Sequence, residues 1–169
     1  NTPLVQSEAE LCAAFIDEFN RLPGWTCYPE TAGFDILVVH EEGRQIGVEA
    51  KLQLNAKVAD QILPQHWQDR YGAPGPDHRM VIVGRITEAS QGIARLLEMC
   101  GVAVLAPHRG YVRRNGSYVE GPDFGLSHWV KHFNEPNLFD WNPAERCHVP
   151  IVVPDVPAGV PAPLRLTQW

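Results

Sequence analysis

Three residues whose side chains could do chemistry together lie in two short apolar segments of the chain. Asp35 belongs to the first segment, and Glu49 and Lys51 belong to the second. Because side chains alternate between the two faces of a β-strand, Glu49 and Lys51 should project to the same side. Two carboxylates and an ammonium on one sheet surface are costly unless they bind something. A divalent cation, which prefers oxygen ligands, is the natural occupant.

Two β-strands must position these residues, and the sequence pattern predicts both of them. Residues 33–39 and 46–52 are runs of apolar and β-branched residues bounded by glycine and charge, as is typical of strands. The short polar stretch 40–45 separates them, so they should pair as a hairpin. Asp35, near the start of the first strand, can then reach the side from which Glu49 projects.

The spacing of these residues resembles the motif of the PD-(D/E)xK phosphodiesterase superfamily, the restriction-endonuclease-like nucleases. Asp35 is followed, after thirteen intervening residues, by Glu49-Ala50-Lys51. Phe34 stands where the nominal proline of the motif would be, a position that is loose across the superfamily. Both halves of the motif fall inside apolar strands joined by a short turn, in the order that the family has.

The resemblance implies a magnesium site built from these two strands. Asp35 and Glu49 would each give an oxygen to Mg²⁺, and the backbone carbonyl of Ala50 would give a third. Mn²⁺ would be able to substitute. The metal would make a water more acidic, and Lys51 would orient that water or help to deprotonate it. Gln53, on the same strand face, would hold a water or a phosphate oxygen.

A first helix is predicted over residues 7–22, with Ser7 as its N-cap and Glu10 as its capping-box partner. Its buried face should consist of the apolar residues that repeat at helical spacing, namely Leu11, Cys12, Phe15, Ile16 and Phe19. In several branches of the resembling family a glutamate of the first helix completes the metal site. Glu8 fits that role better than Glu10, which points to the less apolar side. The alternative is a carboxylate favoured by the helix N-terminus alone.

The other predicted elements follow the order of the family core. They are a strand at 25–28, a helix from 55 to about 71, a strand at 80–84, a helix at 88–100 and a strand at 102–105. Asn55 should cap the second helix, and Pro64 should kink or split it. The inward residues of the helix at 88–100 should be Ile93, Leu96, Leu97 and Met99. If the second helix packs over the site, Lys57 and Gln61 could bind nucleic acid.

The order α-β-β-β-α-β-α-β over residues 7–106 predicts an α/β fold with a restriction-endonuclease-like core. A mixed central sheet flanked by helices should be followed by an irregular C-terminal extension. The predicted regions are a nuclease-like core at 1–107, an extension packed on the core at 108–149, and a proline-rich arm or linker at 150–169.

The extension contains basic and aromatic residues around an Asn115-Gly116 turn of hairpin type. The arginines could bind backbone phosphates while Tyr111 or Tyr118 stacks on an unpaired base. A solvated hairpin is an equal alternative. The arginines in question are Arg109, Arg113 and Arg114.

Composition bounds these expectations. The chain has 169 residues, a formal net charge of −6 and four cysteines without CxxC spacing. The length suits one α/β domain with appendages, and no stretch approaches the ~20 apolar residues that cross a bilayer. The scattered cysteines predict reduced thiols in a cytoplasmic protein and argue against an iron–sulfur cluster. The negative charge argues against strong sequence-independent affinity for DNA.

Two functions remain open on these grounds. The first is a metal-dependent nuclease acting on nucleic acid, with DNA as the expected substrate, that could work as a homodimer. The second is a catalytically inactive module of the same fold, which binds nucleic acid or protein inside a larger phage, plasmid or defence assembly. Apolar periodicity that resumes at residues 164–169 raises the expectation of a further C-terminal domain.

Overall fold

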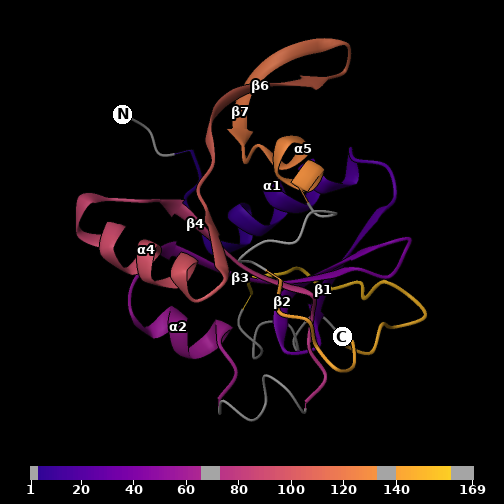
Figure 1. Cartoon of the computed structure of the whole chain (residues 1–169). Coiled ribbons are helices and arrows are strands. Elements are labelled where there is room, and N and C mark those ends of the chain that lie inside the picture. Colours follow the sequence, from indigo (N-terminus) through magenta and orange to yellow (C-terminus); the bar gives the residue numbers. More distant parts are fainter. Residues whose placement is uncertain (1–3, 66–72, 133–139, 161–169) are drawn as a thin grey trace.

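Five strands form one mixed sheet in the order β1-β2-β3-β4-β5 (Figure 1). The computed structural model describes residues 4–65, 73–132 and 140–160. The first three strands pair antiparallel, whereas β3–β4 and β4–β5 pair parallel. The strands are β1 (Trp25–Thr31), β2 (Phe34–His40), β3 (Gln45–Gln53), β4 (His78–Arg85) and β5 (Val102–Leu105). All five predicted strands are present, and the predicted hairpin of β2 with β3 is confirmed.

Helices cover both faces of this sheet, with α1 on one side and α2 and α4 on the other (Figure 1). The alternation of strand side chains produces two separate cores. Met80 and Ile82 of β4 pack with α1, whereas Val81 and Val83 pack with α2 and α4. The predicted α/β fold with a mixed sheet flanked by helices is therefore confirmed. The helices are α1 (Glu8–Asn20), α2 (Lys57–Ile62) and α4 (Gln91–Met99), which the short 3-10 turn η1 (Glu88–Ser90) precedes.

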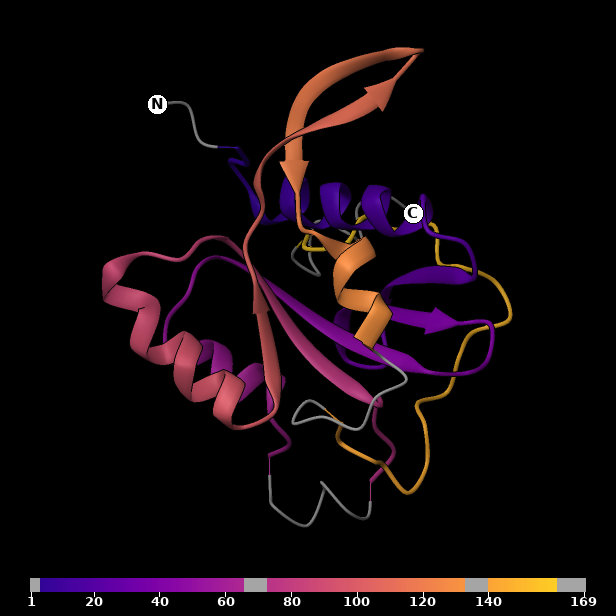
Figure 2. The same cartoon turned by 45° about the horizontal axis from the view of Figure 1, so that its top comes forward.

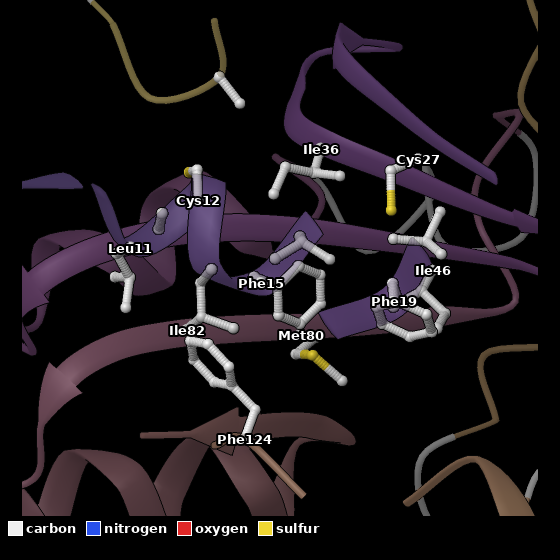
Figure 3. Packing of buried hydrophobic residues seen from close by; sticks show 14 of the residues in the cluster. Leu11, Cys12, Phe15, Phe19, Cys27, Ile36, Ile46, Met80, Ile82 and Phe124 are labelled. Carbon is white, nitrogen blue, oxygen red and sulfur yellow. The ribbon is translucent and has the colours of Figure 1, made fainter. Parts of the chain in front are cut away.

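The first helix begins where the sequence predicts. The Ser7 hydroxyl accepts a hydrogen bond from the Glu10 backbone N–H at 3.1 Å, so Ser7 is the N-cap. The Glu10 carboxylate accepts the N–H of Gln6 at 2.8 Å. Four of the predicted core residues of α1 are buried in one hydrophobic cluster with the strands (Figure 3), namely Leu11, Cys12, Phe15 and Phe19. The fifth, Ile16, is partly buried against this cluster.

Two residues predicted to face inward from α4 face the solvent instead. Leu96 is 68% exposed and Met99 is 74% exposed, whereas Ala94 and Leu97 are buried and Ile93 is partly buried. The reason is the position of β5 at the edge of the sheet, where α4 covers the margin and buries a narrow stripe. Each residue turns the helix by about 100°, so a stripe centred on positions 94 and 97 leaves positions 96 and 99 outside.

The second helix is shorter than predicted. The N-cap is Ala56, which makes no side-chain capping hydrogen bond, so the prediction of Asn55 as the N-cap is wrong by one position. Asn55 lies just before it, and its side-chain oxygen accepts the N–H of Lys57 at 3.0 Å. The helix ends at Ile62, and Leu63 is already extended, because the residue before Pro64 is sterically disfavoured in a helix. Residues 66–71, which the prediction included in this helix, lie outside the described residues.

After the main sheet the chain forms the β6–β7 ribbon, a separate two-stranded sheet that projects from the body (Figure 2). Asn115 and Gly116 have φ of 50° and 81°, which is the conformation of the predicted hairpin turn. The chain after the ribbon returns to the body, where Phe124 and Leu126 enter the α1 core and Trp141 enters the opposite core. The elements of this region are β6 (His108–Arg114), β7 (Ser117–Asp123), α5 (Leu126–Trp129) and η2 (Val130–His132).

A buried carboxylate on α1 fixes the chain that leaves the ribbon. Glu18 is 9% exposed and accepts the backbone N–H groups of Phe124 and Leu126, each at 2.8 Å. Burial raises the pKa of Glu18, although the two N–H donors act in the opposite direction. The buried carboxyl group therefore caps backbone N–H groups of a distant segment, although helical periodicity alone would have placed this residue at the surface.

An amide fixes the end of the extension in a similar way. The Gln45 side chain, at the start of β3, donates to the Cys147 carbonyl at 2.8 Å and accepts the Cys147 N–H at 2.9 Å. Beside it, Arg146 forms an ion pair with Asp77 at 2.9 Å.

Among the described ranges no helix is long and apolar enough to span a membrane. The four cysteines are free, as predicted.

Replacing Glu18 by alanine should destabilise the protein, because two buried N–H groups would lose their acceptor. We expect a loss of about 2–4 kcal/mol, since each unsatisfied buried donor costs about 1–3 kcal/mol. Urea denaturation measures this loss as a lower midpoint. Glu10→Ala, which removes an exposed acceptor from the same helix, should cost less than about 1 kcal/mol. Equal losses in the two variants would contradict the role given to Glu18.

Candidate active site

The β-ladder is interrupted on both sides of Asp35. Toward β1, the paired residues are Pro29 with Ile36 and then Thr31 with Phe34. The turn between them has positive φ at Ala32 and Gly33, and Glu30 itself has φ of 48°. A non-glycine residue held in this region marks a locally strained strand. The strain lies next to Asp35, where the regular pairing of β1 with β2 is broken.

On the β3 side, a hydrogen bond to the Asp35 side chain takes the place of backbone pairing between the strands. Backbone pairing ends with Ile36 opposite Val48, and the Asp35 Oδ2 then accepts the N–H of Ala50 at 2.9 Å. In an antiparallel pair the N–H and C=O of one residue face the same neighbour. The Ala50 carbonyl therefore lies on the β2 side of β3, as the Ala50 N–H does.

Glu49 is the most perturbed acid of this region. Ile36 pairs with Val48 in the antiparallel register. Asp35, which precedes Ile36, therefore lies opposite Glu49, which follows Val48. The side chain of Glu49 is 8% exposed. Burial, the negative charge of Asp35 and a hydrogen bond between the two carboxyl groups raise the pKa of Glu49 to about 9. The charge of Glu30 acts in the same direction, whereas the ammonium of Lys51 opposes it.

Lys51 connects the strand to the first helix. Its Nζ lies 3.9 Å from Oε1 of Glu8, and both side chains are about one third exposed, at 27% and 37%. Glu8, rather than Glu10, is thus the α1 carboxylate at this site, as the sequence indicated. An ion pair this exposed adds little stability. Its effect is to hold the ammonium beside the two strand carboxylates.

Four carboxylates lie within electrostatic range of their common neighbour Cys12, and we call Glu8, Glu30, Asp35 and Glu49 the acidic cluster. All four act on one buried thiol, that of Cys12, which lies one turn after Glu8 on α1. Burial raises the pKa of this thiol, and the charges of the four acids raise it further. Cys12 therefore stays protonated and is no nucleophile.

The proline-rich arm contributes a segment that the sequence did not place at the site. We call residues 156–160 the strap. Within residues 150–160 the chain has no helix or strand, yet Ala158 is buried in the α1 core. The Gly159 N–H donates to Oε1 of Glu30 at 3.1 Å. A Cβ at Gly159, whose φ is +75°, would lie 3.0 Å from both the Cys12 sulfur and the Glu8 carbonyl oxygen. Glycine is required for this approach.

The remaining candidates are dispersed. Gln53 ends β3 and is exposed, opposite Arg85 of β4. On α2, Lys57 and Gln61 are exposed, whereas Val58 and Ile62 of the same helix are buried against the sheet. Arg109 and Arg113 lie on the β6–β7 ribbon, and the side chain of Arg114 lies outside the described part of the chain. The structure thus brings together Asp35, Glu49, Ala50, Lys51 and Glu8, and Gln53 lies two residues beyond Lys51 on the same strand.

The donors present match one kind of metal site and not another. In the described ranges, no three His, Cys, Asp or Glu side chains are grouped closely enough to hold a metal ion, so there is no closed cage of the structural zinc type. Mg²⁺ usually takes one or two carboxylates and keeps several waters. Asp35, Glu49 and the Ala50 carbonyl fit that second pattern.

Comparison of the chain with protein-family models, with curated proteins and with solved structures found no match. The functional interpretation therefore rests on the residues of the site.

Stability should depend on pH through Glu49. Its pKa is about 9 in the folded protein against an ordinary value of 4.5, so in this window the folded state keeps a proton that the unfolded state has released. Raising the pH from about 5 to 9 should lower the free energy of unfolding, by up to about 1.4 kcal/mol per pH unit. Urea midpoints in EDTA at several pH values measure this slope.

Glu49→Gln should flatten that slope because the amide does not titrate. Glu41→Gln, at an exposed position of the β2–β3 connection, is the control and should keep the wild-type slope. A slope that survives in Glu49→Gln would show that Glu49 does not carry the proton.

The strap can be tested through Gly159. Gly159→Ala should cost about 2–4 kcal/mol, because a side chain is strained at positive φ and would also meet Cys12 and the α1 backbone. Gly33→Ala is matched to it, since Gly33 has φ of +84° but nothing within 4 Å of a built Cβ. That variant should cost about 1–2 kcal/mol. If urea denaturation gives equal losses, the strap does not pack against α1 in solution.

Proposed function

We propose that this chain is a metal-dependent phosphodiesterase that cleaves nucleic acid, with DNA as the expected substrate, at the site formed by Asp35, Glu49 and Lys51. The observation that carries the proposal is the meeting of Asp35 and Glu49 where the β2–β3 ladder ends. Their carboxyl groups share a hydrogen bond and repel each other once both are charged, and a divalent cation would relieve that repulsion.

The fold supports the resemblance to the PD-(D/E)xK phosphodiesterases. The element order α1-β1-β2-β3-α2-β4 and the sheet that changes from antiparallel to parallel pairing at β3 agree with a restriction-endonuclease-like core. The resemblance placed its motif on the hairpin of β2 with β3, and its α1 glutamate is Glu8.

Each residue would have a distinct part in hydrolysis. Asp35, Glu49 and the Ala50 carbonyl would hold Mg²⁺ or Mn²⁺. When bound, such a cation makes a water molecule more acidic and polarises a phosphate oxygen. Lys51 would orient the attacking water and offset the charge that develops on the phosphate. Glu8 would keep the Lys51 ammonium in place, and Gln53 would contact substrate at the exposed end of β3.

The decisive experiment is cleavage of a mixed panel of substrates in Mg²⁺, Mn²⁺ and EDTA. The panel contains supercoiled plasmid, linear duplex, single-stranded DNA and RNA. Wild type should cleave at least one of them in a metal-dependent manner. Glu49→Gln and Lys51→Ala should each lower the rate on the order of 100-fold or more, because the first removes a ligand of the cation and the second removes the positive charge beside the reacting phosphate. Lys131→Ala, at an exposed lysine remote in sequence, is the control and should keep the rate.

A second readout separates loss of chemistry from loss of metal. Mn²⁺ should raise the melting temperature of wild type and not that of Asp35→Asn. Unchanged cleavage in both active-site variants would refute the proposal. Absence of all cleavage, together with absence of any Mn²⁺ stabilisation, would favour the alternative of a non-catalytic module that binds nucleic acid or protein within a larger assembly.

A further inference from the structure

The two faces of the β6–β7 ribbon differ in chemistry. Strand residues that are paired across a ladder share a face, and the register pairs Tyr111 with Glu120 and Arg113 with Tyr118. With the adjoining pair of Arg109 and Pro122, this face carries two tyrosines, two arginines, one glutamate and one proline. The centre of the opposite face is apolar, and its pairs are Val112 with Val119 and Gly110 with Gly121, flanked by His108 with Asp123 and Arg114 with Ser117.

The tyrosines of the first face are open to solvent. Tyr111 is 77% exposed and Tyr118 is 70% exposed. They are diagonal neighbours across the ladder, which places such residues roughly 7–8 Å apart. A large aromatic ring gains nothing from water, so two of them held together on a projecting ribbon (Figure 2) form a surface for a flat, apolar ligand group.

The charge of the ribbon defines the rest of that ligand. Residues 111–119 contain two arginines and no acidic residue, although the whole chain has a net charge of −6. The acid of this face, Glu120, is paired with Arg109 at 2.9 Å. Arg113 is thus a cation next to exposed rings on an otherwise acidic protein. Aromatic faces interleaved with arginine suit a polyanion with exposed bases.

The ribbon starts near the C-terminal ends of β3, β4 and β5, the same end of the sheet at which the acidic cluster lies. The parallel register pairs Ala50 with Ile82, and Ile82 with Leu105. These three residues are therefore level across β3, β4 and β5. Neighbouring strands lie about 4.8 Å apart, so Leu105 is displaced from Ala50 by roughly 10 Å. The ribbon begins three residues later, at His108, beside the site rather than behind it.

We propose that the β6–β7 ribbon binds a single-stranded stretch of nucleic acid and leads it to the acidic cluster. Bases stack on Tyr111 and Tyr118, and Arg113 contacts the phosphate backbone. A duplex fits less well, because its bases are already stacked on one another and offer the tyrosines no free face. The proposal takes the identity of the polymer from the proposed function, but its test is binding and needs no cleavage.

The test is fluorescence anisotropy at low salt in EDTA, with Glu49→Gln as the parent so that no probe is cleaved. The probes are a labelled 20-mer of single-stranded DNA, the matching RNA and the matching DNA duplex. Single strands should bind more tightly than duplex. Changing Tyr111 or Tyr118 to alanine should weaken single-strand binding roughly 5- to 150-fold each, the range found for loss of one stacked base. Duplex binding should change less than about 2-fold, because it does not use the rings.

Three further variants isolate the source of binding. Changing both tyrosines to phenylalanine should retain single-strand affinity, because the stacking face remains. Arg113→Ala should weaken all three probes and lower the slope of log affinity against log salt by about 1. Val119→Thr, on the opposite face of the ribbon, is the matched control and should bind as the parent does. Melting temperatures confirm that each variant is folded.

The outcomes separate this proposal from the proposed function. Unchanged affinity for single strands in both Tyr111→Ala and Tyr118→Ala, tighter binding of duplex, or no binding of any probe would overturn the ribbon proposal. None of these results affects cleavage that depends on Glu49. Tyrosine-dependent binding with no cleavage in Mg²⁺ or Mn²⁺ would support the ribbon and count against the nuclease. A preference for DNA or RNA in the same assay identifies the polymer.

Discussion

The contact between the carboxyl groups of Asp35 and Glu49 is the constraint to which the rest of the site responds. The antiparallel register of β2 and β3 forces it, and burial prevents water from screening it. The fold compensates with the Ala50 N–H on Asp35 and the Lys51 ammonium nearby. Without a cation, Glu49 relieves the remaining repulsion by keeping its proton. A buried pair of acids that keeps a proton in this way is typical of functional sites rather than of positions optimised for stability.

Local signals were sufficient to predict most of the elements. The alternation in residues 33–39 and 46–52, the capping serine at Ser7 and the Asn115-Gly116 turn each depend on a few neighbouring residues, and each was found where predicted. The pairing of Asp35 with Glu49 followed from the same short-range pattern. Glu8 could be chosen over Glu10 because helical periodicity predicts which face of the helix each side chain points to, as well as the helix itself.

Errors arose where packing over a distance decides the outcome. Leu96 and Met99 satisfy the helical spacing, but their exposure depends on α4 lying over an edge strand. Glu18 caps backbone groups more than 100 residues away in sequence, and Gln45 binds Cys147 across 102 positions. Gly159 lies in a proline-rich stretch that local composition indicates to be a linker. No pattern within a single segment contains information about such partners.

The strap also has a consequence for the order in which the protein is made. Glu30 and Gly159 are 129 residues apart, so their hydrogen bond cannot form until nearly the whole described chain has left the ribosome. At about 5–20 residues per second, the β1–β2 hairpin waits roughly 6–26 s for its last contact. During that interval the sheet can assemble while the Glu30 side of the acidic cluster is still open. Completion of the site is thereby coupled to the synthesis of the strap.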